Sequence, residues 1–439
     1  MVSHKALNTK LDPHVETTTL DNGLAVTTVA LPHLHTAVCA LFVKVGARFE
    51  SPADNGLSHF VEHMLFRGTE RFASAEIDQL FDAMGAELNA GTDKEGTTVY
   101  ARMLDQHMQR AFDVMADMVW RPAFNDVDPE REVVLEEIAM YEDDPQDTVF
   151  DVLGTSIFGD HPLGRPIIGR APVIRETPVD QIAAFHARRY VPSSVVIAAA
   201  GSVDHDAIVA LAERTLHGLR AGESAPQPDP APQLPQSRLR FQTKETEQVH
   251  VCLGGPGLSR ADERRYAVRV LDAIFGGLSS SRLFQSVREE RGLAYAVYSF
   301  AGNFVDTGQV GLYVGTRPDN LAEAMQVVEA ELRRLREQPV SAEELDRARE
   351  NVKARVVLAM ESSAARMNRL GSATLYGLPL LEADEIMARF DAVTIDDLQS
   401  LVAELWAPER LSAAGIGPSQ EAFRAAVEPV CPVAEAVAA

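Results

Sequence analysis

The chain has 439 residues, of which 46% are hydrophobic and 24% charged, and its formal net charge at pH 7 is −23. This length predicts two or three domains, because a single hydrophobic core stops growing well below it. The acidic balance excludes nucleic-acid phosphate and anionic lipid as main partners, since a negative surface would repel both.

The N-terminal ten residues contain neither the apolar core of a secretory signal nor an Arg-rich amphipathic helix. No apolar run approaches the roughly 18 residues that a membrane-spanning helix needs. Cys39, Cys252 and Cys431 lie far apart and form no C-x-x-C pair, so no disulfide framework or thiolate metal site is indicated. Together these features predict a cytoplasmic protein with no membrane partner.

Hydrophobic periodicity predicts strands and helices that alternate along the chain. We expect strands at 23–29, 36–45, 97–103, 195–200, 248–253, 294–300, 308–314 and 411–416, and helices at 57–66, 75–84, 107–119, 128–141, 264–274, 282–290, 320–337 and 342–361.

The helix at 57–66 carries two histidines and an acid at H-x-x-E-H spacing. His59 and His63 are four residues apart, so both imidazoles project from one face and can reach a single tetrahedral metal ion. Glu62 shares that face, where a carboxylate can take a proton from a metal-activated water. The pattern therefore predicts one catalytic zinc ion per chain, with Glu62 as the base.

A buried helix with satisfied core histidines is the alternative, because Leu57, Phe60 and their apolar neighbours would form a buried face without any metal. Burying two histidines and a glutamate without a metal or charge partner is costly, which favours the metal site.

The segment 85–93 includes Asn89 and Ala90 and precedes the strand at 97–103. Its Asn-Ala-Gly sequence is typical of a turn that joins two strands.

The helix at 128–141 offers the third metal ligand. Glu137 lies three or four residues from Val133, Val134, Met140 and Tyr141 and next to Ile138, which predicts that it points inward, whereas Glu132 and Glu136 lean toward solvent. Glu130 lies two turns before Glu137 on the same face and is a candidate to orient a ligand. An equally simple interpretation of Glu130 is a first-turn acid favoured by the helix dipole.

A proline-rich linker at 221–237 divides the chain into near-equal halves. Each half ends in the same pattern of a helix, a proline and an apolar strand that stops at a glycine, first at 179–201 and again at 395–417. The constant offset of 216 positions indicates an internal duplication. We therefore expect an N-terminal zinc-binding domain at 1–220 and a homologous C-terminal domain at 238–439. The region of the second half that corresponds to the histidine motif, near 268–272, has no histidine and is expected to bind no metal.

These spaced motifs, with Glu137 74 positions after His63, are similar to those of the pitrilysin/insulinase family of zinc peptidases, especially its short bacterial members and the mitochondrial processing peptidase β subunit. The resemblance covers nearly the whole chain. It implies that His59, His63 and Glu137 hold zinc and that Glu62 activates water.

The resemblance also implies substrate-binding residues. The segment with Asn89 and Ala90 would form a strand edge that pairs with an extended peptide. In the second half, Gly276–Phe284 leads to Arg288 and Tyr295, which match the family's Arg and Tyr that hold the substrate backbone and polarise its carbonyl. Without the family, Arg288 would be a surface arginine and Tyr295 an aromatic of a strand core.

The expected fold is α+β, with two homologous α/β-sandwich domains in a clam-shell arrangement. The resemblance implies a zinc-dependent endopeptidase that acts on peptides or unfolded polypeptide segments. Because one chain holds both the zinc motif and the Arg/Tyr pair, we expect a homodimer. The simplest interpretation of the negative charge is that the acidic residues lie on a solvated surface. The more specific alternative is that they line an interior chamber that favours basic peptides.

Two alternatives to this function stay open. The chain could be a non-catalytic structural subunit, although such relatives usually lose motif residues that are intact here. It could also be a catalytic subunit that needs a different, inactive homologue as a heterodimer partner.

Overall fold

The computed structural model describes residues 14–216, 219, 228–232, 238–432 and 435–436. The N-terminal ten residues and most of the 221–237 linker lie outside this part of the chain. The described chain forms two compact units, each built on a mixed six-stranded sheet with helices on its faces. Among the described residues, no helix combines the length and the apolarity that a membrane crossing requires.

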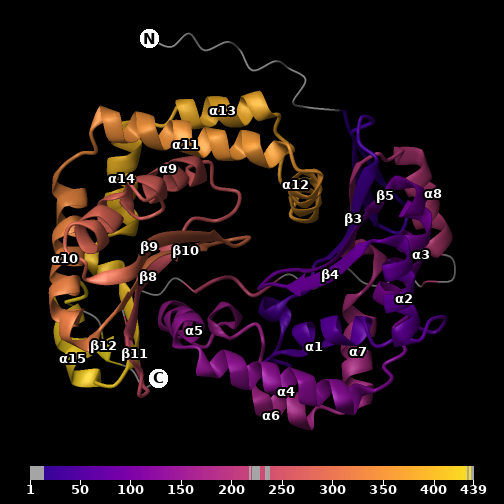
Figure 1. Cartoon of the computed structure of the whole chain (residues 1–439), viewed down its shortest axis with the longest axis horizontal. Coiled ribbons are helices and arrows are strands. Elements are labelled where there is room, and N and C mark those ends of the chain that lie inside the picture. Colours follow the sequence, from indigo (N-terminus) through magenta and orange to yellow (C-terminus); the bar gives the residue numbers. More distant parts are fainter. Residues whose placement is uncertain (1–13, 217–218, 220–227, 233–237, 433–434, 437–439) are drawn as a thin grey trace. The chain divides into compact units, whose positions relative to one another are not determined.

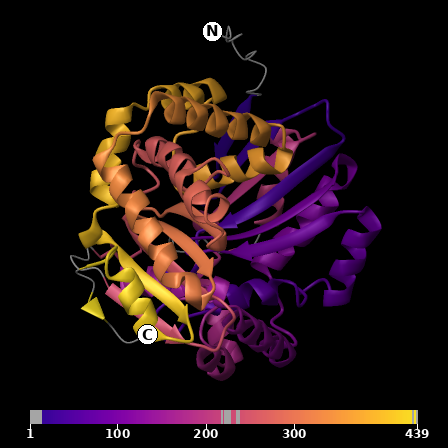
Figure 2. The same ribbon diagram turned by 60° about the vertical axis from the view of Figure 1, so that its left-hand side comes forward.

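The first unit contains the sheet β1-β2-β6-β3-β5-β4. Its strands are β1 (Val15–Thr19), β2 (Ala25–Ala30), β3 (Thr36–Val43), β4 (Glu87–Thr92), β5 (Thr97–Leu104) and β6 (Val195–Gly201). Its helices are α1 (Leu57–Leu65), α2 (Ser74–Met84), α3 (Met108–Trp120), most of α4 (Val127–Asp143), α6 (Ala171–Glu176), α7 (Val179–Arg189), α8 (His205–Thr215) and α12 (Ser363–Leu375). The indigo and purple strands of this sheet can be followed in Figures 1 and 2. Within the described residues, β4 pairs with β5 alone and forms a sheet edge.

The second unit contains the sheet β12-β7-β11-β8-β10-β9. Its strands are β7 (Arg238–Thr243), β8 (Val249–Gly257), β9 (Ala294–Asn303), β10 (Gly308–Thr316), β11 (Ser412–Gly417) and β12 (Glu435–Ala436). Its helices are α5 (Pro145–Phe158), α9 (Arg265–Phe275), α10 (Leu321–Glu337), most of α11 (Ala342–Met360), most of α13 (Ala383–Asp391), α14 (Ile395–Leu405) and α15 (Gln420–Val427), with a π-helical turn at Phe284–Glu289.

The two units confirm the duplication. From the second strand onward the two sheets have the same order, and both contain one parallel pair, β2 with β6 and β7 with β11, at the same place. The helices α7 and α14 begin and end exactly 216 positions apart, as the sequence pattern predicts. The fold is therefore α+β with two homologous units, as expected.

The units do not coincide with the two halves of the sequence. Residues 140–165, with α5, belong to the second unit, and residues 356–384, with α12, belong to the first. The helix α5 packs on β11, β8 and β7, while α12 packs on β6, β3 and β2 (Figure 1). The predicted domains at 1–220 and 238–439 take no account of this exchange, because periodicity shows that a helix has an apolar face but not which sheet it covers.

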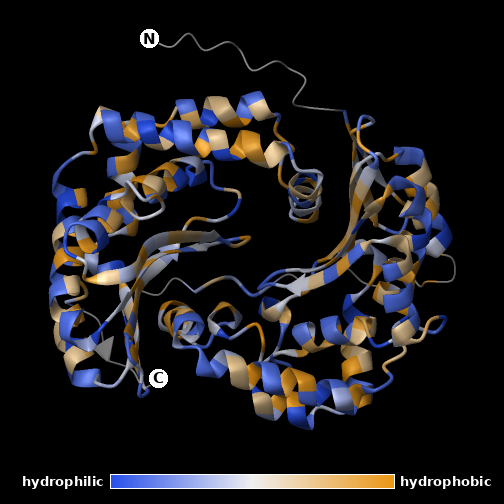
Figure 3. Ribbon diagram, viewed as in Figure 1, coloured by the Kyte–Doolittle hydropathy of each residue, from blue (hydrophilic) through white to orange (hydrophobic). Residues whose placement is uncertain are grey.

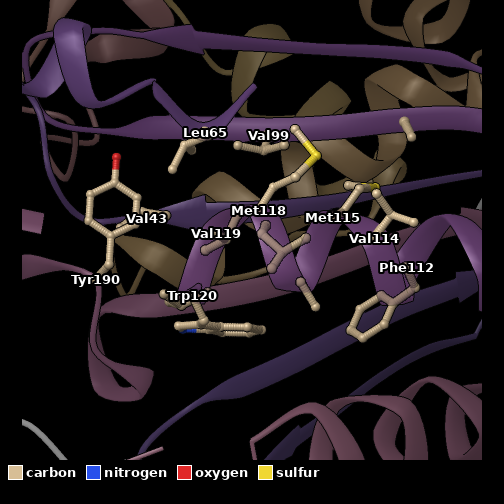
Figure 4. Packing of buried hydrophobic residues seen from close by; sticks show 14 of the residues in the cluster. Val43, Leu65, Val99, Phe112, Val114, Met115, Met118, Val119, Trp120 and Tyr190 are labelled. Atoms are coloured by element: carbon tan, nitrogen blue, oxygen red, sulfur yellow. The ribbon is translucent and has the colours of Figure 1, made fainter. Parts of the chain in front are cut away.

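The core that supports the site lies between the first sheet and its helices. Figure 4 shows Val43 and Val99 of the strands beside Met115, Met118 and Val119 of α3. Each helix carries both polar and apolar residues around its axis (Figure 3), as expected when one face of the helix packs on a sheet and the other faces solvent. This packing fixes α1, whose residues Leu57, Phe60, Val61, Met64 and Leu65 are all fully buried.

Candidate metal centre

The helix α1 presents His59, Glu62 and His63 from the side that its buried apolar residues do not occupy. It begins after Gly56, whose φ of 102° suits glycine, and a Cβ there would approach Gly169 Cα to 2.7 Å. No side chain at the N-cap position caps the helix. Instead the buried carboxylate of Glu50 accepts hydrogen bonds from the backbone N–H groups of Gly56, at 2.8 Å, and Ser58, at 2.7 Å. Glu50 thus satisfies orphan donors at the start of the helix.

Three side chains converge beyond that face. His59 and His63 of α1 and Glu137 of α4 each offer a ligand atom, and these atoms all lie within 4.8 Å of one another. In the described part of the chain this is the one such group of metal-ligating side chains, and none occurs in the second unit.

The spacing of these donors suits one tetrahedral divalent ion. With metal–ligand bonds of about 2.1 Å, neighbouring donors lie about 3.4 Å apart. The Nε2 atoms of His59 and His63 lie 3.7 Å and 3.2 Å from Oε2 of Glu137. The two imidazoles meet edge to face, with ring centroids 4.7 Å apart. Nitrogen and oxygen donors in this number leave one coordination position for water or substrate.

Glu130 fixes the ring of His63. Its Oε1 lies 2.7 Å from Nδ1 of His63, so that nitrogen donates and Nε2 keeps its lone pair toward Glu137. The second oxygen of Glu130 accepts from Arg67, and the carboxylate is 5% exposed. These contacts are those of a group that orients a ligand, rather than of a first-turn acid in solvent.

His59 is held in the form that binds metals. Burial lowers the pKa of His59 to about 4, and the neighbouring His63 charge adds to this effect. His59 is therefore neutral at neutral pH, and a neutral imidazole is the metal-binding species. Its Nδ1 is buried and has no hydrogen-bond partner among the described residues.

Glu62 lies next to His63 and is partly buried. Burial raises the pKa of Glu62, whereas a hydrogen bond from Thr92 and the His63 charge lower it, and the Glu137 charge raises it. The Thr92 hydroxyl donates to Oε2 of Glu62 at 2.6 Å.

Tyr190 is buried in the cluster of Figure 4. Burial raises the pKa of its phenol, Thr97 lowers it, and the Glu62 charge raises it.

The structure places Asn89 and Ala90 in an edge strand rather than a turn. They lie in β4, opposite Tyr100 and Val99 of β5. The other edge of β4 has no strand partner within the described residues. Turn chemistry suggested otherwise because Asn and Gly are common in turns, but regular pairing along β4 overrides that preference.

Arg288 and Tyr295 lie together in the second unit. Arg288, in the π-helical turn, stacks on Phe284 and on Tyr295, with its guanidinium carbon 4.7 Å and 4.5 Å from the two ring centroids. Tyr295 stands in the edge strand β9 and is 78% exposed. The alternative interpretation of Tyr295 as an aromatic of a strand core is therefore wrong, and the pair presents a phenol and a guanidinium side by side.

Sequence reasoning missed Glu50, Arg67 and Thr92. Arg67 is four residues after His63, so its place beside the histidine follows from helical spacing. Thr92 is two residues after Ala90 and therefore on the same face of the strand. Glu50 gives no such signal, because its carboxylate reaches α1 through a loop.

Comparison with known proteins agrees with this geometry. Residues 25–171 match the insulinase family (peptidase family M16), and residues 178–352 match the peptidase M16 inactive domain. An uncharacterized zinc protease of Streptomyces coelicolor is 39% identical over 420 residues, covering 93% of this chain and 90% of that protein. The chain belongs to the insulinase family. The resemblance inferred from the motifs is confirmed.

A second curated relative is equally similar in sequence, and two solved structures share the fold. An uncharacterized zinc protease of Mycobacterium tuberculosis is 40% identical over 408 residues, which cover 91% of this chain and 92% of that protein. The solved structure of a protease from Helicobacter pylori has a TM-score of 0.88 at 22% identity and covers 92% of this chain and 100% of its own. A peptidase M16 inactive domain from Pseudomonas fluorescens has a TM-score of 0.86 at 23% identity, with coverages of 92% and 98%. The two structures show that the fold is shared. The histidine motif falls in the part that matches the insulinase model.

Proposed function

We propose that this protein is a zinc-dependent endopeptidase that cleaves peptides or unfolded polypeptide segments. The observation that carries the proposal is the convergence of His59, His63 and Glu137, with the carboxylate of Glu62 beside them. The names of the relatives as zinc proteases support zinc as the metal and proteolysis as the activity.

His59, His63 and Glu137 would hold the ion. When bound, zinc supplies Lewis acidity that lowers the pKa of a water molecule and polarises a carbonyl oxygen. Glu130 holds His63 in the tautomer whose Nε2 is free to bind.

Glu62 is the proposed general base. In this role its carboxylate takes a proton from the attacking water and later delivers it to the leaving amine. Partial burial beside His63 suits this role, because it keeps the carboxylate away from bulk water while a hydroxyl from Thr92 fixes one of its oxygens.

The free edge of β4 is the proposed binding place for the peptide backbone. An extended peptide can add to such an edge through backbone hydrogen bonds, at Asn89 and Ala90, with little demand on its side chains. This mode selects extended segments and excludes folded proteins. For Arg288 and Tyr295 we propose hydrogen bonds to the substrate backbone and its developing oxyanion.

Internal cleavage distinguishes an endopeptidase from an exopeptidase. Unstructured peptides blocked at both termini should be cut at internal bonds, and mass spectrometry of the products gives the position. Removal of zinc with a chelator should stop cleavage, and added Zn²⁺ should restore it. Products that differ from the substrate only by terminal residues would contradict the endopeptidase assignment.

The assembly is proposed to be a homodimer that is active without another subunit. Light scattering on the purified active protein gives its mass in solution. Activity that appears only on adding a homologous chain would support the heterodimer alternative instead.

A further inference from the structure

The carboxylate of the proposed base is held by a hydroxyl from the neighbouring strand. The Thr92 Oγ1 donates to Oε2 of Glu62 at 2.6 Å, which is a short bond between a neutral donor and a carboxylate. Thr92 is the last residue of β4. The backbone of α1 fixes where the Glu62 side chain starts, but its rotatable bonds leave the carboxylate free to turn. The contact with Thr92 removes that freedom.

Thr92 is itself supported by Thr97 of the neighbouring strand β5. Its Oγ1 lies 3.2 Å from Oγ1 of Thr97, the residue opposite it in the β4–β5 register. Thr97 is fully buried, and its hydroxyl lies 2.8 Å from the backbone oxygen of Val45. Each hydroxyl has one hydrogen to donate. Thr92 donates to Glu62 and Thr97 donates to the backbone oxygen of Val45, so Thr97 supports Thr92 by its contact in the β4–β5 register rather than by giving it a hydrogen.

We propose that Thr92 is a positioning residue of the peptidase reaction, whose hydroxyl orients the Glu62 carboxylate, and that Thr97 holds Thr92 in place. This inference rests on the proposed function. It also links two parts of the site: β4, whose residues Asn89 and Ala90 are proposed to align the substrate, carries the group that aims the base. One strand then sets both the register of the peptide and the direction of proton removal.

The test compares substitutions that differ only in the hydroxyl. Thr92→Val keeps the shape and the strand preference of threonine but removes the donor, and Thr92→Ser keeps the donor. Thr98→Val is the matched control, because Thr98 is on the adjoining strand and makes no side-chain hydrogen bond among the described residues. Zinc content and the visible spectrum of the Co²⁺-substituted protein report whether the metal site is intact.

We expect Thr92→Val to lower kcat on the order of 10- to 100-fold, with KM, zinc content and the Co²⁺ spectrum unchanged. Thr92→Ser should restore most of kcat, and Thr98→Val should resemble wild type. Thr97→Val should lower kcat less than Thr92→Val. If Thr92→Val does not fold, the ratio of kcat between Thr92→Ser and Thr92→Ala measures the contribution of the same hydroxyl group to kcat.

A wild-type kcat in Thr92→Val, or an equal loss in Thr92→Ser, would overturn the positioning role while leaving the peptidase assignment intact. Crystal structures of the zinc-loaded Val and Ser variants decide the matter without turnover. We expect Glu62 to keep its place in the Ser variant and to move in the Val variant. An unmoved Glu62 in the Val variant would overturn the inference even if the wild type cleaved no peptide, which would itself contradict only the proposed function.

Discussion

Oε1 of Glu130 lies 2.7 Å from Nδ1 of His63, and the same carboxylate accepts from Arg67. A buried acid on α4 thus orients a ring on α1. Replacing Glu130 with Gln should lower zinc affinity about 10- to 100-fold, because the ring loses its charged acceptor. Competition with a fluorescent chelator measures this affinity. Glu132→Gln, on the exposed face of the same helix, is the control, and equal affinities in the two variants would refute the orienting role.

Glu50 caps α1 from outside the helix. Glu50→Ala would leave the N–H groups of Gly56 and Ser58 without their acceptor in a buried place. We expect a loss of about 2 kcal/mol in the free energy of unfolding, together with weaker zinc binding, since α1 carries both histidines.

Asp204→Ala is the control for this prediction. Asp204 caps α8 through the N–H of Ala207, so its loss should also destabilise the protein but leave zinc affinity unchanged. Urea denaturation and chelator competition measure the two effects. An Asp204→Ala variant that lost zinc as readily as Glu50→Ala would show that general destabilisation, not the cap on α1, weakens the metal site.

The ion pair between Arg282 and Glu344 gives the second unit a pH-dependent stability. Burial alone would raise the pKa of Glu344, but hydrogen bonds from Arg282, at 2.8 Å and 3.0 Å, and from Ser341 lower it to about 2 from its ordinary 4.5. A folded-state pKa below the unfolded value means that the stabilisation is fully present above pH 4.5 and is lost as the pH falls toward 2.

Glu344→Gln should therefore cost on the order of 2 to 3 kcal/mol at pH 7 and progressively less below pH 4.5. Urea midpoints of the variant and the wild type across this range measure the difference. Glu343→Gln, at the exposed neighbouring position, should have little effect at any pH. A Glu344→Gln penalty that stayed constant down to pH 3 would mean that the ion pair is not its cause.

Gly91 stands in β4 between Ala90 and Thr92, and a Cβ built there meets no atom within 4 Å. Gly91→Phe should fold normally and, if peptides add to this edge, reduce cleavage of substrates with a bulky residue at one position. Profiling a peptide library before and after the substitution measures that preference. Gly302→Phe provides the control, since Gly302 lies in the edge strand β9 with equally open space. Unchanged preference in Gly91→Phe would argue against binding along β4.

Local patterns predicted the elements that form the metal centre. Helical spacing placed His59, Glu62 and His63 on one face of α1, and it chose Glu137 over Glu136 on α4. The chosen face of α4 was partly wrong, however, because Val133 and Met140 are exposed while Glu130 is buried with Val134 and Ile138. The apolar residues of α4 indicated its buried face less reliably than the helical spacing of the acidic residues did, since single hydrophobic residues commonly face solvent.

Contacts between distant segments could not be predicted in this way. The exchange of α5 and α12 between sheets depends on which apolar faces meet, and the sequence of a helix does not specify its partner sheet. The hydrogen bonds from the start of α1 to Glu50 and from Thr92 to Glu62 could not be predicted either, because they form only when separate elements pack together.

The most direct test of the account is to assay the wild-type chain and Glu62→Gln side by side for bound zinc and for cleavage of an unstructured peptide library. The account predicts about one zinc ion per chain in both proteins and cleavage by the wild type alone, because the ligands are intact in the variant and only the base is lost. Cleavage by Glu62→Gln at the wild-type rate, or a wild type that binds no zinc, would contradict it.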